Sequence, residues 1–386
     1  MVDGMKSAAV VGAGISGLTA AIALANTGLT VRVLEKADAV RTAGSGIAID
    51  PNAQAMLRRV KALDTALDGL PELRQFVGRD GAGRTLGRYD WTSRVIFFVK
   101  RPQLLKALYE SALARGVEFH LNAEVASVTL DGTVVTTDGR TFRADLVVGA
   151  DGVRSKVRRA LPGRAVLRPL PFRATVTVID PAEHPDENSY NGEWTEYWSG
   201  TKHVYSAPVG GGQTYYAFFS ADFKRLPWRR ITEERLAAEG LDDHDPAVWR
   251  KRFPILGSAI DRVPDTLRSS RFVEVHLRHW SAGRVVVIGD AAHAMAPALG
   301  SGGASGMMDA ISLADYLHRD LSLASALSEW EADHRPLVDR IQRRSRGWAT
   351  LFHCGPLVQR IIFAGVNNTA VLRSMRFGHL GRAPIN

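Results

Sequence analysis

Residues 8–35 read AAVVGAGISGLTAAIALANTGLTVRVLE, and this segment has the pattern of a strand, a helix and a second strand. Ala8–Val11 is a short apolar strand, and Ser16–Asn26 carries apolar side chains at helical spacing. Gly28 ends that helix, and Thr30–Leu34 is the second strand. The beginning of the chain is therefore predicted to form a βαβ unit.

Three glycines between the first strand and the helix, Gly12, Gly14 and Gly17, have the spacing that a pyrophosphate requires. They permit a tight turn, a close backbone approach and close packing of helix on strand, while the helix N-terminus supplies N–H donors. Glu35 closes the second strand, where a carboxylate accepts a hydrogen bond from a ribose hydroxyl. The unit predicts a dinucleotide site, without distinguishing FAD from NAD(P).

The chain has 386 residues, which is more than one compact core usually holds, so we expect two or three domains. Its 45% hydrophobic and 23% charged residues are those of an ordinary folded protein and exclude a disordered or collagen-like chain. Cys354 is the single cysteine, so no internal disulfide forms, and no Cys/His cluster has zinc spacing. We therefore expect a cytoplasmic protein without a bound metal.

Charge and hydropathy exclude two further classes of protein. The net charge of +9 is spread along the chain, and its densest run, Arg335–Arg346, has the spacing of a helix with a basic, solvated face. We therefore expect no nucleic-acid partner, and the positive charge favours a small anionic substrate or a nicotinamide dinucleotide. No apolar stretch reaches the ~18 residues that a membrane span needs, and we expect neither a membrane partner nor a targeting segment.

Turn signals and periodicity divide the rest of the chain into further helices and strands. Four alternating segments between residues 117 and 148 predict a meander of antiparallel strands. From about residue 169 to 279 the strands become rich in Tyr, Phe, Trp and Thr, which predicts a second sheet. The predicted helices are Pro51–Val60, Arg101–Arg115, Ala310–Arg319 and Ala324–Arg346, and the predicted strands are Val117–Leu121, Glu124–Leu130, Val134–Thr137, Thr141–Val148, Leu146–Ala150 and Val285–Ile288.

Two distant segments carry further motifs, GADGVRSKVR at residues 149–158 and GDAAHAMAPALGSGG at residues 289–303. Asp290 follows the buried strand VVVI, so we expect its carboxylate at the carboxyl end of a strand, where it can accept from a ribityl hydroxyl. The backbone N–H groups of Leu299–Gly303 precede a helix and can hold negative charge on a bound cofactor.

With these three motifs in order, the sequence resembles the single-component (group A) aromatic flavin monooxygenases, the para-hydroxybenzoate hydroxylase-like group, over about residues 6 to 346. The resemblance implies FAD as cofactor and NADH or NADPH as co-substrate, with no separate nicotinamide domain. It also implies insertion of one oxygen atom from O2 into a hydroxylated aromatic or N-heteroaromatic ring, through a C4a-hydroperoxyflavin. His293 is then expected to form hydrogen bonds within its loop rather than to act as a general base.

The resemblance assigns roles to particular residues of this sequence. Arg101 is implied to reach the FAD phosphates and Val125 to lie over the adenine, while Pro297 lies near the flavin ring and shapes the oxygen-reaction cavity. Asp151 belongs to the second motif, although it can equally form an ordinary ion pair with Arg154. The predicted FAD-binding residues are Gly12, Gly14, Ile15, Ser16, Gly17, Glu35, Lys36, Arg41, Arg101, Val125, Asp151, Gly289, Asp290, Pro297, Leu299, Gly300, Gly302 and Gly303.

Within this family the sequence resembles 2-methyl-3-hydroxypyridine-5-carboxylate oxygenase and 5-pyridoxate oxygenase, which hydroxylate a pyridinol and open its ring. The shared words include GDAAHAM followed by PAL, and GEW at residues 192–194. The fit implies that Tyr215 contacts the substrate, that Lys202 takes the place of an arginine, and that Phe272 replaces a tyrosine. Lysine offers a point charge where arginine grips a carboxylate with two hydrogen bonds, so a different substrate is expected. The alternative is an exposed Lys202 and a Tyr215 that only packs.

We thus predict a two-domain α/β flavoprotein, with a Rossmann-like FAD-binding domain, a mixed β-sheet substrate domain and C-terminal helices. The FAD-binding domain is predicted to comprise residues 1–75, 97–165 and 280–346, the substrate domain 76–96 and 166–279, and the C-terminal segment 347–386. The catalytic residues are predicted to be Lys202, Tyr215 and Pro297, in a monomer or homodimer. The alternatives are a flavin oxidoreductase without oxygenation, a flavin halogenase and a non-enzymatic FAD-binding sensor.

Overall fold

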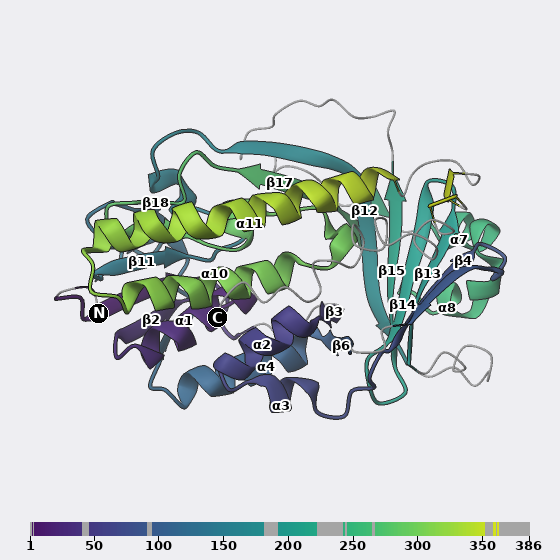
Figure 1. Cartoon of the computed structure of the whole chain (residues 1–386), viewed down its shortest axis with the longest axis horizontal. Helices are drawn as coiled ribbons and strands as arrows, with labels where there is room; N and C mark the ends of the chain where they lie inside the picture. The colour runs from purple at the N-terminus through teal and green to yellow at the C-terminus, as the bar shows by residue number, and fades with distance from the viewer. Residues whose placement is uncertain are drawn as a thin grey trace.

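The structure is a computed structural model in which two β-rich halves lie side by side (Figure 1). One half is built on a six-stranded, mainly parallel sheet covered by helices, and the other on an eight-stranded, mainly antiparallel sheet. The structure describes residues 2, 4–40, 46–90, 95–180, 192–221, 242–243, 245–264, 267–351, 358–359 and 361–362.

The six-stranded sheet has the strand order β18-β19-β11-β1-β2-β7. All neighbouring strands run parallel except β18, which is antiparallel to β19. The central strands are buried on both faces, as their continuous apolar sequences require. The strands are β1 (Ser7–Val11), β2 (Thr30–Leu34), β7 (Glu118–His120), β11 (Leu146–Gly149), β18 (Ser281–Ala282) and β19 (Val285–Val287).

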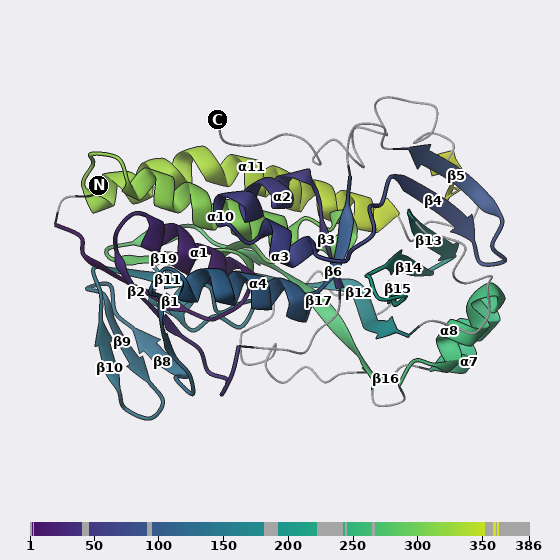
Figure 2. The ribbon, with the colours of Figure 1, turned by 90° about the horizontal axis from the view of Figure 1, so that it is seen from below.

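Helix α1 (Ile15–Asn26) follows β1 directly and packs against α4 (Arg101–Leu113) and α10 (Gly302–Leu317). Helix α11 (Leu323–Leu351) covers α10 from outside (Figure 1). Figure 2 shows these helices on one side of the sheet, while a small three-stranded sheet extends from the other side. Shorter elements complete this half, namely α2 (Pro51–Arg59), α3 (Leu63–Leu67), α9 (Asp290–His293), η1 (Val157–Ala160), and the pair β3 (Gly46–Ile49) and β6 (Phe97–Lys100).

The eight-stranded sheet has the order β16-β17-β12-β15-β14-β13-β4-β5, with only β13 and β4 parallel. Its long strands β12 and β17 extend from one half of the molecule to the other (Figure 1). One face packs on α7 (Pro246–Arg252), η3 (Pro254–Leu256) and α8 (Gly257–Asp261). The strands are β4 (Gln75–Asp80), β5 (Thr85–Asp90), β12 (Val166–Ile179), β13 (Glu193–Ser199), β14 (Lys202–Pro208), β15 (Thr214–Ala221), β16 (Asp242–Asp243) and β17 (Arg268–His276).

The predicted four-stranded meander is wrong in two respects. Its first segment forms β7, which pairs with β2 in the six-stranded sheet, so the meander contains only β8 (Val125–Val128), β9 (Thr133–Thr136) and β10 (Thr141–Arg143). The predicted strand Thr141–Val148 is divided between β10 and β11, because Asp145 accepts hydrogen bonds from the backbone N–H groups of Lys6 and Ser7 beside β1.

Two other features of the helices bear on the prediction. Helix α10 begins at Gly302, well before the predicted Ala310. The prediction missed its first turns because they are rich in glycine and carry no apolar periodicity. None of the helices in the described part of the chain combines the length and the apolar character that crossing a bilayer requires.

Candidate active site

The glycine-rich turn after β1 forms a cradle at the N-terminus of α1. Gly12 has φ +100°, and a Cβ there would lie 2.7 Å from the carbonyl oxygen of Ala150, while a Cβ on Gly17 would overlap the carbonyl oxygen of Gly12. A Cβ on Gly14 would instead have no described residue within 4 Å. Helix α1 has no side-chain cap and no acidic residue in its first turn, so its N–H groups remain available to an anion.

Glu35 connects this turn to the end of β2. The side chain is buried, and its two oxygens accept from the backbone N–H groups of Ala13 at 2.7 Å and Ala37 at 3.0 Å. The carboxylate therefore lies beside the cradle at the carboxyl end of a parallel strand, where a ribose hydroxyl would be held. The neighbouring Lys36 is exposed.

Asp151 follows β11 at the same edge of the sheet. Its Oδ2 accepts from the backbone N–H groups of Lys156 at 2.6 Å and Val157 at 3.3 Å. Its Oδ1 is buried without a hydrogen-bond partner in the described part of the chain, and burial raises the pKa of the carboxyl group. An acceptor atom in this position fits a hydroxyl donor of a bound dinucleotide.

The third motif follows β19 and reaches the same edge. Gly289 has φ +59° and is followed by Asp290, which is exposed and begins α9. The hydroxyl of Ser16 in α1 fills the place that a Cβ on either Gly289 or Gly306 would need. These contacts bring the start of α1, the end of β19 and the start of α10 together, as the sequence predicted for residues of one site.

The segment after α9 leads through a short 3-10 helix, η4 (Pro297–Leu299), into α10. Gly300 has φ +65°, and the hydroxyl of Ser301 donates to the carbonyl of Leu299 rather than capping α10. No acidic side chain lies in the first turn of α10. The N–H groups at this N-terminus are therefore available to partial negative charge on a flavin ring. Gly303 lies against Ile47 of β3, where a Cβ would come 2.6 Å from Cδ1.

The described residues thus fit FAD, since two uncapped helix N-termini, the open space at Gly14 and an unpartnered Asp151 oxygen all lie at one sheet edge. Ile15 is buried at the first turn of α1. Arg101 is the exposed first residue of α4, and Val125 is buried at the start of β8. Their roles stay predictions. Arg41 lies outside the described residues.

The eight-stranded sheet presents an aromatic face to this site. Directly paired residues of β14 and β15 share a face, so His203, Tyr205 and Ala207 lie with Phe219, Ala217 and Tyr215. Except for His203, these side chains form one buried apolar cluster with Ala296, Ala298 and Leu299, which flank Pro297. The face therefore adjoins the segment that is predicted to contact the flavin ring.

Tyr215 is buried within this face. A Cβ on Gly46 would come 2.8 Å from the Tyr215 ring, and the ring of Phe98 lies 5.5 Å away. Burial raises the pKa of the Tyr215 hydroxyl well above its ordinary value, so the side chain stays neutral. Phe272 stacks on Phe219 with ring centroids 6.0 Å apart and so belongs to the same surface.

The expectation that Lys202 and Tyr215 face the substrate together is wrong. Lys202 pairs with Ser220, so strand alternation places it on the opposite face, where its Nζ lies 4.5 Å from the centre of the Trp249 ring in α7. Burial and the nearby Arg252 lower the pKa of Lys202. Lys202 is therefore neither exposed nor a neighbour of the cofactor segment.

Sequence reasoning missed His203, the residue next to Lys202. This side chain is 2% exposed and stacks between Trp198, at 5.3 Å, and Phe219, at 4.6 Å between ring centroids. Tyr215 pairs with Ala207 of β14, and every second residue back along β14 lies on the same face, which places His203 there. This alternation could have identified His203 from the sequence.

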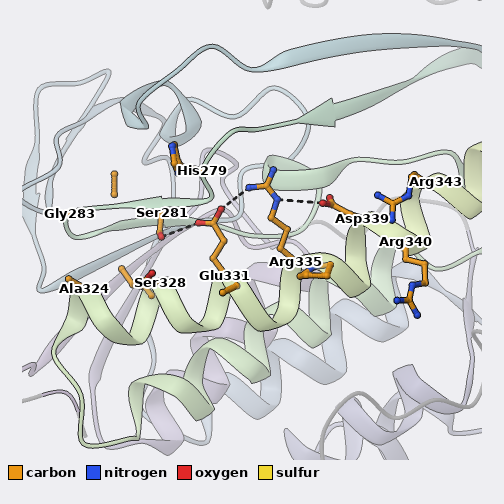
Figure 3. A pocket seen from close by; sticks show the side chains of 14 residues that line it. His279, Ser281, Gly283, Ala324, Ser328, Glu331, Arg335, Asp339, Arg340 and Arg343 are labelled. Carbon is orange, nitrogen blue, oxygen red and sulfur yellow. Dashed lines mark hydrogen bonds and ion pairs between the residues drawn. The ribbon is translucent and has the colours of Figure 1, made fainter.

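A surface hollow of about 670 Å³ lies elsewhere, between β18 and α11 (Figure 3). Glu331 and Arg335 line this hollow and form an ion pair, and Arg335 forms a second ion pair with Asp339. None of the predicted FAD or substrate residues lines it.

A glycine cradle and acidic residues at the carboxyl ends of parallel strands, with an aromatic sheet face that packs against Ala296–Leu299, together define an FAD-dependent oxidoreductase. The chain belongs to the FAD binding domain family, whose model matches residues 5–345. This match confirms the predicted FAD-binding fold and the prediction that FAD is the cofactor.

Three proteins illustrate the similarity. The 2-heptyl-3-hydroxy-4(1H)-quinolone synthase of Mycobacteroides abscessus is 34% identical over 349 residues, covering 88% of this chain and 88% of that protein. The 3-hydroxybenzoate 6-hydroxylase of Klebsiella oxytoca is 25% identical over 389 residues, covering 96% of this chain and 95% of that protein. The solved tetrameric form of 2-methyl-3-hydroxypyridine-5-carboxylic acid oxygenase has a TM-score of 0.83 and 26% identity, covering 99% of this chain and 97% of that chain.

The comparisons confirm that the chain is an FAD-dependent aromatic-ring monooxygenase, an enzyme class that uses NADH or NADPH as co-substrate. They support this assignment over a flavin reductase, a halogenase or a sensor.

Proposed function

We propose that the enzyme hydroxylates a neutral, bicyclic N-heteroaromatic ring of the 4-quinolone type that carries an alkyl chain. The observation that carries the proposal is the composition of the aromatic face. The residues of β13, β14 and β15 on this face include neither lysine nor arginine, and they are Trp194, Glu196, Trp198, His203, Tyr205, Ala207, Tyr215, Ala217, Phe219 and Ala221.

Flat aromatic surfaces bind flat rings by stacking and apolar contact, whereas a carboxylate substrate needs a cationic partner. Since Lys202 lies on the other face, the anionic substrate favoured by the sequence loses its predicted partner. The name of the M. abscessus relative describes a 4-quinolone with a heptyl chain and a 3-hydroxyl group. By similarity, the substrate is the corresponding ring before that hydroxyl is added.

FAD, when bound and reduced, supplies with O2 the electrophilic oxygen for the ring. The chain's own residues then have three tasks. The aromatic face orients the ring against the Pro297 segment, and its burial excludes water from the reacting carbon. His203 is the titratable imidazole on this face. We assign it to accept the proton of the ring N–H or hydroxyl group, because loss of this proton makes the ring more electron-rich.

The test measures NADH and NADPH oxidation by the FAD-loaded enzyme in air with 2-heptyl-4(1H)-quinolone, 3-hydroxybenzoate and a hydroxypyridine carboxylate as separate additions. We expect strong stimulation by the quinolone alone and, under labelled O2, a product that gains one labelled oxygen atom. Stimulation confined to a carboxylate would overturn the proposed substrate class while leaving the monooxygenase assignment intact.

Oligomeric state is a separate matter. We retain the prediction of a monomer or homodimer, although the similar pyridine-carboxylate oxygenase was solved as a tetramer. Sedimentation of the FAD-loaded enzyme distinguishes these forms.

A further inference from the structure

Asp309 is a buried carboxylate behind the cofactor motifs that no predicted function uses. It lies within α10 and is fully buried. Its Oδ2 accepts from the backbone N–H of Gly289 at 2.7 Å and lies 2.6 Å from Nε2 of His293. Its Oδ1 lies 2.7 Å from Nε2 of His334 in α11. One carboxylate therefore connects α10 and α11 with the first and last residues of the Gly289–His293 turn.

The charges of this cluster are balanced inside the protein. Although burial favours the neutral acid, the contacts with His293 and His334 hold the pKa of Asp309 well below its ordinary value. Burial opposes the charged form of His293, yet the Asp309 carboxylate raises the pKa of that imidazole. A buried carboxylate is retained at such a position only if its partners satisfy it, since an unpaired buried charge is strongly destabilising.

Helix α11 holds the continuation of the same segment. The side-chain amide of Gln342 donates to the carbonyl of Ala294 at 3.0 Å, and the hydroxyl of Ser345 donates to the carbonyl of Ala296 at 2.5 Å. Both side chains are buried. The segment from Gly289 to Ala296 is thus fixed from behind, while Asp290 and Pro297 at its two ends are predicted to contact FAD on the other side.

We propose that Asp309 is a positioning residue for the FAD site, which fixes Gly289 and His293 so that Asp290 and the turn to Pro297 are presented to the cofactor. Gly289 adopts φ +59° and is crowded by Ser16, so its position depends on the hydrogen bond that its N–H donates. Loss of the charge on Asp309 weakens this bond and releases the turn, even where the helices stay packed.

The test compares Asp309→Asn with Ser312→Ala in the full-length, FAD-loaded enzyme. Ser312 is a matched control because it is buried in the same helix, accepts from Trp330 Nε1 at 2.9 Å and donates to the Asp309 carbonyl, and neither of these hydrogen bonds involves the turn. We measure the FAD dissociation constant by flavin fluorescence, the visible circular dichroism of bound flavin, amide exchange in a peptide covering residues 288–296, and Tm.

For Asp309→Asn we expect about tenfold weaker FAD binding, because a hydrogen bond to a charged group is worth roughly this factor, together with a changed flavin spectrum and faster amide exchange. For Ser312→Ala we expect a lower Tm with FAD affinity, spectrum and exchange unchanged. A lower Tm in both variants with unchanged FAD affinity and exchange would show a purely structural role and overturn the proposal.

If Asp309→Asn does not fold, His293→Ala carries the same test, since it removes one contact between Asp309 and the turn and keeps the Gly289 bond. We then expect FAD binding weakened by about threefold, half of the effect on a logarithmic scale, with faster exchange at residues 288–296. Unchanged affinity and exchange in His293→Ala would count against Asp309 as a positioning residue.

Discussion

The hydroxyl oxygen of Ser16 lies where a Cβ on Gly306 would have to be. Ser16 belongs to the first turn of α1 and Gly306 to α10, and the Cβ of Ser16 would still lie 3.1 Å from such an atom if the hydroxyl rotated away. The two helices therefore approach so closely that the site depends on a glycine far along the chain from the glycine-rich turn.

Gly306→Ala is expected to destabilise the fold by about 1–3 kcal/mol, the usual result of overpacking a close contact. Replacing Ser16 by Ala in the same protein removes the atom that clashes first, so the double variant should recover part of the loss. Chemical denaturation of the two single variants and the double variant measures this coupling. Additive effects would mean that the crowding lies elsewhere.

Gly14→Ala should separate cofactor binding from folding. Its Cβ would meet no atom of the described residues within 4 Å, and Gly14 has φ −80°, which any residue adopts. We therefore expect an unfolding free energy of the FAD-free chain close to that of the unmodified protein, with FAD binding weakened by at least tenfold because the methyl group enters the pyrophosphate space. Gly17→Ala serves as the contrast, since its Cβ would overlap the Gly12 carbonyl oxygen and should destabilise the FAD-free chain itself.

Neighbouring residues of β14 should behave differently in catalysis. His203→Phe keeps an aromatic ring between Trp198 and Phe219 but removes both ring nitrogens, so we expect kcat with the quinolone to fall by about 10²-fold, the lower range for loss of an acid–base group. Lys202→Met should leave KM and kcat within twofold, because Nζ lies on the Trp249 side of the sheet. Steady-state kinetics of both variants check this, and a large effect of Lys202→Met alone would restore the substrate role that the sequence suggested.

Asp50 should make folding stability depend on pH. It is buried at the N-terminus of α2, accepts from the backbone N–H of Ala53 at 2.7 Å, and burial raises its pKa from 3.8 to about 6. A raised pKa means that the folded chain binds the proton more tightly than the unfolded chain. The stabilising contribution is therefore complete below pH ~4 and is lost as the pH rises through about 6.

Asp50→Asn keeps the acceptor for Ala53 and removes this titration. Between about pH 4 and pH 7.5, the variant should gain about 2–3 kcal/mol of unfolding free energy relative to the unmodified protein, as a shift from 3.8 to about 6 implies. Urea unfolding at the two pH values measures the difference. Parallel pH profiles would show that Asp50 has an ordinary pKa.

The first βαβ unit, the glycine cradle, Glu35 and the acidic residues that follow β11 and β19 could all be predicted from the amino-acid sequence. These features are local, since a strand of apolar residues followed at once by glycine or aspartate places that residue at the carboxyl end of a parallel strand wherever the strand joins the sheet. The three motifs are far apart along the chain, but they could still be assigned to one site, because parallel strands of one sheet end at the same edge.

Which face of each strand meets the cofactor segment depends on tertiary packing. Alternation determines that Lys202 and His203 point to opposite faces, but the packing of α7 on one face and of Leu299 on the other decides which residue reaches the site. The same holds for Asp309, whose partners Gly289 and His334 lie 20 and 25 residues away in sequence. Contacts of this kind depend on how helices and sheets pack across the whole chain, and no local periodicity encodes them.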